Sequence, residues 1–232
     1  MRLPAKATHQ QTRAINQGLV LRTLYDLGPI SRAEVARLTG LTRTTVSELV
    51  GELLGEGLVE EVGRGPSSGG KAPILVRVIP DARLVIGLDL GEDAFVGALV
   101  DLRGGIHHRV VEPIEGRDGA AALAAVERVV DELIAAAPEG TLLGVGVGTP
   151  GLVDTVTGTI RWAVNLDWQD LPLGRMLSER TRLPAYVAND SRAAAMGEHL
   201  FDLDRRAPNL VAIKLGTGIG AGIVIGGELL QG

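Results

Sequence analysis

The sequence SRAEVARLTGLTRTTVSELVGELLGEGLVEE at residues 31–61 contains two short helical segments separated by a turn with a glycine. Ser31 has the side chain of a helix N-cap, and the first predicted helix covers residues 32–38. Gly40 takes the position of the left-handed residue that ends such a helix. A second helix is predicted over residues 42–56. Two helices joined by a short glycine-containing turn are typical of a helix-turn-helix.

The flanking residues extend this motif in both directions. Apolar residues at helical spacing predict another helix upstream, over residues 14–27. Downstream, a short strand at 58–62, a Gly/Ser/Pro-rich loop at 63–71 and a returning strand at 74–79 predict a β-hairpin. A helix, a helix-turn-helix and a hairpin in this order form a winged helix. We therefore assign residues 1–80 to a winged helix-turn-helix DNA-binding domain.

The second helix of the motif would enter the major groove of DNA, where residues near its N-terminus meet base edges. Arg43 can bridge guanine O6 and N7, and the neighbouring hydroxyl groups can bind phosphates or bases. Arg64 and Lys71 in the wing are candidates for backbone or minor-groove contacts. The alternative is a helical domain whose hydroxyl groups only cap helices and face solvent. The candidate DNA-binding residues, with double-stranded DNA as the expected partner, are Ser31, Arg32, Thr42, Arg43, Thr44, Thr45, Ser47, Arg64 and Lys71.

The charge distribution agrees with DNA binding by the N-terminal segment. Residues 1–80 hold 10 Lys and Arg against 7 Asp and Glu, a net charge of +3. Residues 81–232 hold 13 against 21, a net charge of −8. A basic segment before an acidic body suggests that only the first segment meets a polyanion.

Composition excludes several classes of protein. The chain has no cysteine, which rules out disulfides, thiolate zinc sites and a cysteine nucleophile within it. No apolar run reaches the roughly 18 residues that a membrane span needs, and the N-terminus lacks the apolar core of a secretory signal. We expect a cytoplasmic protein that has no membrane partner.

Residues 81–232 have the pattern of an α/β domain with a mixed sheet, because three adjacent strands precede a helix and a further strand. A loop through Pro150 and Gly151 is expected to continue as far as Trp168. The predicted strands are 83–91, 94–101, 107–114, 142–148, 185–188, 210–215 and 219–225, and the predicted helices are 119–137, 171–181 and 191–200.

Two of the predicted hairpins resemble each other. A shift of 125 residues sets LVIGLDLGEDAFVGALV at 84–100 over LVAIKLGTGIGAGIVIG at 210–226, with one residue of slack and three identities. The repeat predicts two related lobes whose hairpin turns face a shared cleft and offer backbone N–H groups to phosphates. Because so few residues follow the second hairpin, we expect the second lobe to be truncated in this chain.

The wing sequence SSGGKAP and the segments VGVGTPGLVD, NLDW, VANDSRAAAMGE and LGTGIGAGIVIGGEL resemble the ROK family (repressor, open reading frame, kinase). The resemblance covers nearly the whole chain, in the expected order. It is to the repressor branch, which places a winged helix before an actin-like (ribonuclease H-like) ATPase fold. It implies a sugar-responsive transcriptional repressor of carbohydrate metabolism genes that acts as a homodimer or higher homo-oligomer.

The resemblance also implies a site for a sugar or sugar-phosphate effector. In the family's kinases, the Asp of an Asn-Asp pair is the general base on a sugar hydroxyl, and Asp190 matches it. The alternative is that Asp190 only caps the following helix. The implied sugar-binding residues are Gly148, Pro150, Gly151, Asn165, Asn189 and Asp190. The family's Cys-rich zinc site and its downstream sugar-binding Glu and His would lie beyond Gly232. We therefore expect no metal or cofactor in this chain, and a structural zinc only in an uncut protein.

One loop departs from the kinase pattern. The family's first phosphate loop reads Asp-x-Gly-Gly-Thr, whereas this chain places Glu92 and Asp93 after Gly91. Carboxylates facing a nucleotide phosphate are unfavourable, so we predict no kinase activity and no catalytic residue. The second phosphate loop survives as Gly216, Thr217 and Gly218, either as a vestigial nucleotide site or as a simple turn. Two alternatives remain: a sugar kinase with an appended DNA-binding domain, and a winged-helix regulator whose body is only a dimerisation scaffold.

Overall fold

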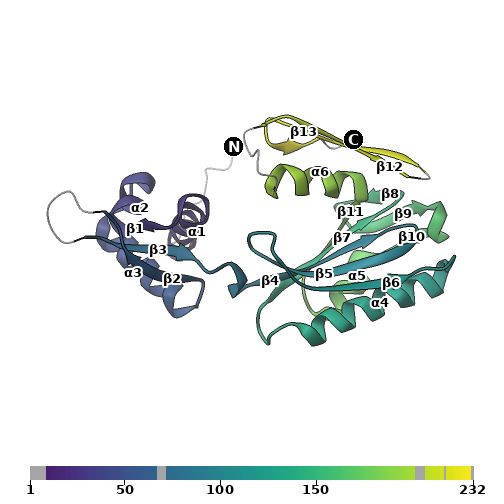
Figure 1. Ribbon diagram of the computed structural model, residues 1–232, viewed down its shortest axis with the longest axis horizontal. Coiled ribbons are helices and arrows are strands. Elements are labelled where there is room, and N and C mark those ends of the chain that lie inside the picture. The colour runs from purple at the N-terminus through teal and green to yellow at the C-terminus, as the bar shows by residue number, and fades with distance from the viewer. Residues whose placement is uncertain (1–8, 67–71, 202–206, 217, 231–232) are drawn as a thin grey trace, which may run out of the picture. The chain divides into compact units, whose positions relative to one another are not determined.

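The computed structural model describes residues 9–66, 72–201, 207–216 and 218–230 (Figure 1). The chain divides into two compact units, Met1–Ala82 and Arg83–Gly232. Each unit buries its own set of apolar side chains. No helix in the described ranges is long and apolar enough to cross a membrane.

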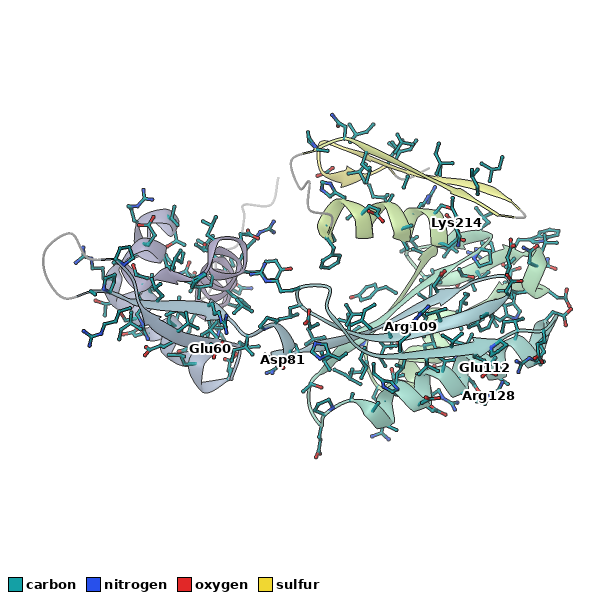
Figure 2. The ribbon with its side chains drawn as sticks, in the orientation of Figure 1. Glu60, Asp81, Arg109, Glu112, Arg128 and Lys214 are labelled. Atoms are coloured by element: carbon teal, nitrogen blue, oxygen red, sulfur yellow. The ribbon has the colours of Figure 1, made fainter. Side chains whose placement is uncertain are left out.

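Unit 1 is a winged helix, as predicted. Three helices are followed by a hairpin, and Val20 and Leu24 of the first helix are fully buried together with the apolar side of the third. Across the hairpin, Arg77 donates a hydrogen bond of 2.8 Å to Glu60, which is labelled in Figure 2. The elements are α1 (His9–Leu27), β1 (Ile30–Ser31), α2 (Arg32–Thr39), α3 (Arg43–Gly55), β2 (Val59–Arg64) and β3 (Ile74–Val78).

Local side chains start and end the helices of unit 1 as the sequence predicts. The Ser31 hydroxyl accepts the backbone N–H of Glu34 at 3.2 Å and begins α2. Thr42 accepts the N–H of Thr45 at 3.2 Å and begins α3. Gly40 ends α2 with a φ of +71°, a backbone conformation that glycine adopts without strain. The turn between the two helices is therefore encoded by residues within it.

One feature of unit 1 differs from the prediction. Ile30 and Ser31 form a short strand, β1, which pairs with β3 and turns the predicted hairpin into a three-stranded sheet of order β1-β3-β2. Two residues are too few to give a period-2 pattern in the sequence. Within α1, Val20 and Leu24 are buried, whereas Ile15 and Leu19 are exposed.

Unit 2 is built on a five-stranded mixed sheet of order β11-β7-β4-β5-β6. Strand β7 runs parallel to β4 and β11, whereas β4, β5 and β6 pair antiparallel. This is the predicted α/β architecture. The bounds are β4 (Leu84–Leu90), β5 (Ala94–Asp101), β6 (Ile106–Pro113), β7 (Leu142–Thr149) and β11 (Ala185–Asn189).

Helices cover both faces of this sheet (Figure 1). Helices α4 (Gly119–Ala136) and α5 (Leu173–Thr181) contribute buried side chains to the main core. Helix α6 (Asp190–Phe201) lies on the opposite face from α4, because Gly148 contacts Ala193 of α6 whereas Gly97, on the other face, contacts Val129 of α4. Near the middle of α4, Arg128 pairs with Glu112 of β6 (Figure 2).

The prediction of a continuous loop from Pro150 to Trp168 is wrong. This segment contains β8 (Leu152–Asp154) and β9 (Thr159–Ala163), which form a three-stranded antiparallel sheet with β10 (Trp168–Leu171). Trp168 is buried, and its indole N–H donates to the Gly119 carbonyl at 2.9 Å. The strands are too short for a clear alternating pattern, and this tertiary bond fixes the sheet against α4.

A third sheet of unit 2, with three strands, follows α6. It contains the predicted hairpin β12 (Leu210–Leu215) and β13 (Ile219–Ile225), with β14 (Glu228–Leu229) added at the edge. Gly222 lies directly against α6, and a Cβ at this position would come within 2.5 Å of the Ala195 Cβ. Glycine therefore allows β13 to approach α6 closely enough to form one wall of a cavity.

Candidate functional site

The first turn of α3 is the candidate DNA-reading surface of unit 1. Thr42, Arg43, Thr44 and Ser47 are exposed there, and Thr45 is half-buried. Arg43 makes no ion pair with any residue in the part of the chain that the structure describes. Its guanidinium is therefore available for phosphates or base edges.

Other predicted DNA-binding residues have partners within the unit. Ser31 and Thr42 cap helices, and the Thr42 and Thr45 hydroxyl oxygens lie 2.9 Å apart. Arg32 donates to Glu61 of β2 at 2.8 Å, which fixes α2 against the wing. Arg64 is exposed at the end of β2, and Lys71 lies outside the described residues.

The remainder of α3 is tied to α1 through its carboxylates. Arg13 of α1 pairs with Glu52, and the Gln17 amide donates to Glu56 at 3.2 Å. Glutamates near the C-terminal end of α3 would repel DNA phosphates, but these two bind the neighbouring helix. The part of α3 suited to DNA is therefore its N-terminal turn.

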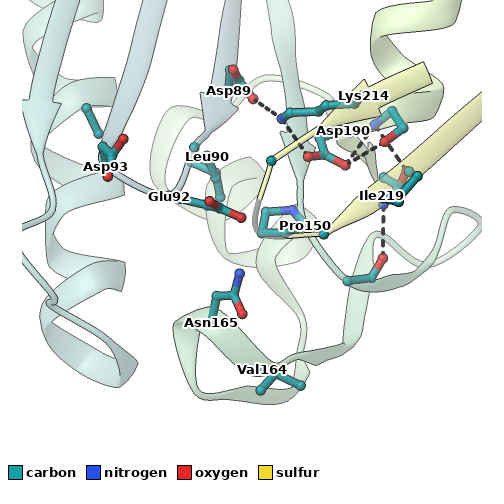
Figure 3. A pocket seen from close by; sticks show the side chains of 18 of the residues that line it. Asp89, Leu90, Glu92, Asp93, Pro150, Val164, Asn165, Asp190, Lys214 and Ile219 are labelled. Carbon is teal, nitrogen blue, oxygen red and sulfur yellow. Dashed lines mark hydrogen bonds and ion pairs between the residues drawn. The ribbon is translucent and has the colours of Figure 1, made fainter. Parts of the chain in front are cut away.

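Unit 2 contains a cavity of about 600 Å³ at the ends of β4 and β11 (Figure 3). Its walls come from the turn after β4, the segment after β7, the segment before β10, the start of α6 and the β12–β13 hairpin. The residues discussed below that line it are Asp89, Gly91, Glu92, Asp93, Pro150, Gly151, Trp162, Asn165, Asn189, Asp190, Lys214, Gly216 and Gly218.

Five of the six residues assigned to the sugar by resemblance line this cavity. The exception is Gly148, which is buried beneath α6, where a Cβ would lie 3.5 Å from the Cα of Asp190. Its lack of a side chain allows α6 to begin close to β7. Both glycine turns of the internal repeat also face the cavity, through Gly91 and through Gly216 and Gly218. Thr217 lies outside the described residues.

Asn189 and Asp190 share the capping of α6, because both side chains accept the backbone N–H of Ser191. Oδ1 of Asn189 accepts the backbone N–H groups of Ser191 and Arg192 at 3.1 and 3.4 Å, and its Nδ2 donates to the Gly151 carbonyl at 3.2 Å. Asn189 thus joins the start of α6 to the turn after β7. Because Asn189 holds both elements, the Asp190 carboxylate can be placed at the cavity wall.

Asp190 has partners on both of its carboxylate oxygens. Oδ1 accepts the backbone N–H of Ser191 at 2.7 Å, and Oδ2 accepts from Nζ of Lys214 at 2.6 Å. The side chain of Asp190 is only 14% exposed, so these bonds form in a partly dehydrated setting. A carboxylate in this arrangement is a strong hydrogen-bond acceptor.

Two residues of the cavity, Lys214 and Trp162, have no signal in the sequence that marks them as site residues. Lys214 occupies an ordinary strand position in the sequence, and its ion pair with Asp190 is visible only in three dimensions. Trp162 is 58% exposed although it is large and apolar, and it lines the cavity. An exposed indole beside a few polar groups suits a ligand with both apolar and hydroxyl-bearing faces.

The cavity is strongly acidic. Four carboxylates line it, Asp89, Glu92, Asp93 and Asp190, and the cationic lining residue is Lys214. Burial lowers the pKa of Lys214, but the hydrogen bond to Asp190 and the attraction of Asp89, Asp190 and Glu92 outweigh it and raise the pKa above its ordinary value. Lys214 is therefore cationic at neutral pH. Within the described residues, no group of three or more His, Asp or Glu side chains is placed to hold a metal ion.

Comparison with known proteins relates both units to described families. The ROK family model matches residues 85–232, and the MarR family model matches residues 12–67. A putative xylose repressor of Caldicellulosiruptor sp. strain Rt8B.4 is 40% identical over 97% of this chain. The match covers 57% of that relative, so this chain spans little more than half of its length.

Solved structures give the same relationship. The crystal structure of a ROK family transcriptional regulator, a homologue of the E. coli MLC protein, matches 95% of this chain and 57% of its own, with a TM-score of 0.77 and 28% identity. A ROK family glucokinase from Streptomyces griseus in complex with glucose and AMPPNP matches 64% of this chain and 46% of its own, with a TM-score of 0.56 and 35% identity. With a winged helix preceding an actin-like α/β body, the chain belongs to the ROK family.

Proposed function

We propose that this chain is the DNA-binding and effector-binding part of a sugar-responsive transcriptional regulator that represses carbohydrate metabolism genes in the cytoplasm. The observation that carries the proposal is the presence, in one chain, of a winged helix with an exposed Arg43 and an acidic, hydroxyl-accepting cavity around Asp190. Neither feature alone distinguishes a regulator from a DNA-binding protein without an effector, or from an enzyme.

The DNA-binding half rests on the N-terminal turn of α3. Arg43, Thr44 and Ser47 would meet base edges and phosphates in the major groove, and Arg64 of the wing would meet the backbone. Homo-oligomerisation would bring two such helices onto the half-sites of an operator. Ser31 and Thr42 support this surface as helix caps, and Thr45 supports it through its hydrogen bonds to Thr42.

For the effector half, we propose a sugar in the cavity, with D-xylose as the first candidate because relatives are named as xylose repressors. Asp190 and Asn165 would accept and donate hydrogen bonds to its hydroxyl groups, and Trp162 would cover its apolar face. Sugar binding would release DNA if the cavity binds sugar more tightly in the arrangement that does not fit the operator.

The kinase alternative is opposed by the charges of the cavity. Glu92 and Asp93 line it where the nucleotide of a kinase requires positive or neutral groups, and Lys214 already occupies one oxygen of Asp190. The retained Gly216–Gly218 turn favours the kinase alternative, because such turns also bind phosphates. We propose that here it serves as a turn.

The test is fluorescence anisotropy with labelled DNA from the region upstream of the protein's own gene, with non-specific competitor DNA and a series of salt concentrations. The proposal predicts competitor-resistant binding that weakens steeply with salt and is released by D-xylose. L-Arabinose and D-glucose serve as sugar controls. Binding that competitor abolishes completely, or that no sugar changes, would contradict the proposal.

A further inference from the structure

Lys214 connects three elements at the cavity. It extends from β12, and its Nζ lies 2.6 Å from Oδ2 of Asp190 at the start of α6 and 3.9 Å from Oδ1 of Asp89 at the end of β4 (Figure 3). The ammonium group is thus placed between two carboxylates that come from distant parts of unit 2. Its side chain is 43% exposed, so it remains accessible from the cavity.

The bond from Lys214 changes what Asp190 can do. A general base must have a lone pair free to take a proton, and it must favour the protonated form at the moment of transfer. In this structure Oδ1 of Asp190 accepts from Ser191, and Oδ2 accepts from a cation. Both oxygens are therefore already engaged by donors of the same unit, and a proton taken up on Oδ2 would have to displace the ammonium group of Lys214. Asp190 is therefore well suited to accept a hydrogen bond and poorly suited to remove a proton.

The charge around Lys214 also limits the ligand. With four lining carboxylates and one ammonium group, the formal charge of the cavity lining is −3. A phosphorylated sugar would meet this charge at short range, whereas an uncharged sugar would not. Lys214 has three N–H donors, so those not used by Asp190 can bind a second hydroxyl group.

We propose that Lys214 is a positioning residue that fixes Asp190 as a hydrogen-bond acceptor for an uncharged sugar and prevents its use as the base of a phosphoryl transfer. This inference rests on the proposed sugar response and specifies the class of effector. Lys214 would act on the sugar in two ways. It would position Asp190, which binds one sugar hydroxyl, and it would itself donate to another hydroxyl.

The first experiment measures the affinity for D-xylose and D-xylose 5-phosphate by calorimetry, in the wild type and in Lys214→Met, Lys214→Gln and Lys214→Arg. Removing the charge should lower the affinity for D-xylose roughly tenfold or more, because a hydrogen bond to a charged group is lost. Lys214→Arg should restore most of this loss. In the wild type the phosphate ester should bind at least about tenfold more weakly than the free sugar. Arg175→Met, which removes an exposed ion pair with Glu179 on α5, is the matched control and should bind as the wild type does.

A double-mutant cycle separates positioning from general damage. Asp190→Asn, Lys214→Met and the double variant are compared by D-xylose affinity and by melting temperature followed through Trp162 and Trp168, which both lie in unit 2. If Lys214 acts through Asp190, the two effects are not additive, and the double variant should melt about 3 °C or more above the additive value. Should Lys214→Met not fold, the cycle is repeated with Lys214→Gln.

The outcomes are distinguishable. Tight binding of D-xylose by Lys214→Met, additive effects in the cycle, or preferential binding of the phosphate ester would overturn the inference and leave the sugar response intact. Failure of the wild type to bind any sugar would overturn the proposed effector, and the melting cycle would still decide whether Lys214 holds Asp190.

Discussion

Arg43 in unit 1 and Asp190 in unit 2 both carry a charge that the proposed function needs, but their surroundings differ. Arg43 is exposed and makes no ion pair within the described ranges of the chain. Asp190 is largely buried, and both of its oxygens accept hydrogen bonds from residues of the same unit. The candidate DNA-reading surface thus leaves its charge for an external partner, whereas the cavity is organised by bonds within its own unit.

This difference has consequences for substitutions. Substitution of a residue whose partner is another molecule should lower binding affinity and leave the free energy of unfolding unchanged. Substitution of a residue that is hydrogen-bonded inside the unit should lower both binding affinity and the free energy of unfolding, because it leaves a neighbour without a partner. The following predictions test this division, from the largest expected effect to the smallest.

Gly222→Ala should destabilise unit 2 by about 3 kcal/mol, because the added Cβ would meet the Ala195 side chain and the Ser191 carbonyl. The readout is urea unfolding followed by tryptophan fluorescence, since both tryptophans of the chain lie in this unit. Gly197→Ala, in α6 with no atom within 4 Å of the added Cβ, is the control and should stabilise by up to about 1 kcal/mol. Equal unfolding midpoints for the two variants would show that the wall formed by β13 and α6 is not tightly packed.

Arg43→Ala should weaken specific DNA binding roughly 30-fold, which corresponds to about 2 kcal/mol, and leave the free energy of unfolding within about 0.5 kcal/mol of the wild type. Binding is measured by anisotropy in competitor DNA, and unfolding by far-UV circular dichroism. Arg22→Ala on α1, which removes an exposed pair with Asp26, should change neither quantity. A large loss of stability in Arg43→Ala would contradict the assignment of Arg43 to an external partner.

Asp190→Ala should destabilise unit 2 by about 1.5 kcal/mol, because Lys214 and the Ser191 N–H lose their acceptor. Asp93→Ala removes another carboxylate from the same cavity. The Asp93 side chain is exposed and accepts no hydrogen bond from another side chain within the described residues, so this variant should stay within about 0.5 kcal/mol of the wild type. Chemical unfolding at neutral pH compares the two. Equal stability of both variants would remove the distinction between the cavity and the DNA-reading surface.

Asp101 tests internal bonding away from the cavity. Burial raises the pKa of Asp101, but hydrogen bonds from His107 and from the backbone N–H groups of Gly105 and Arg103 outweigh it and lower the pKa below its ordinary value. A lowered carboxyl pKa contributes stability above the unfolded-state pKa of about 3.9, and this contribution is lost as the pH falls through the folded-state pKa. Asp101→Asn should therefore cost about 1 kcal/mol at pH 7 and progressively less below about pH 4. A deficit that is the same at pH 7 and pH 3 would contradict this explanation.

The same contrast explains what could be predicted from sequence. The helices of unit 1 are set by neighbours in the chain, such as Thr42 with Thr45 and the left-handed Gly40, and these predictions are confirmed. The five long strands of unit 2 were also predicted, because their apolar runs are bounded by turn residues. The small sheet of β8, β9 and β10 was missed, since Trp168 and Gly119, which anchor it, are far apart in the sequence.

The cavity was only partly predictable for the same reason. The family resemblance indicated Asn165, Asn189 and Asp190, and the structure brings these residues to one cavity. It gave no indication of Lys214, which is 24 residues from Asp190 in sequence, or of Trp162 as a lining residue. Ion pairs between distant elements have no local sequence signature, so their identification requires the fold.

The most direct test of the central claim, that this ROK body senses a sugar and does not phosphorylate it, is a single assay in which DNA binding and ATP consumption are followed together. The sample contains the protein, its upstream DNA, ATP, Mg²⁺ and D-xylose. The account predicts that DNA is released as the sugar is added, with no sugar-dependent formation of ADP. Sugar-dependent ADP formation that is abolished by Asp190→Asn, with DNA binding unchanged by the sugar, would contradict it.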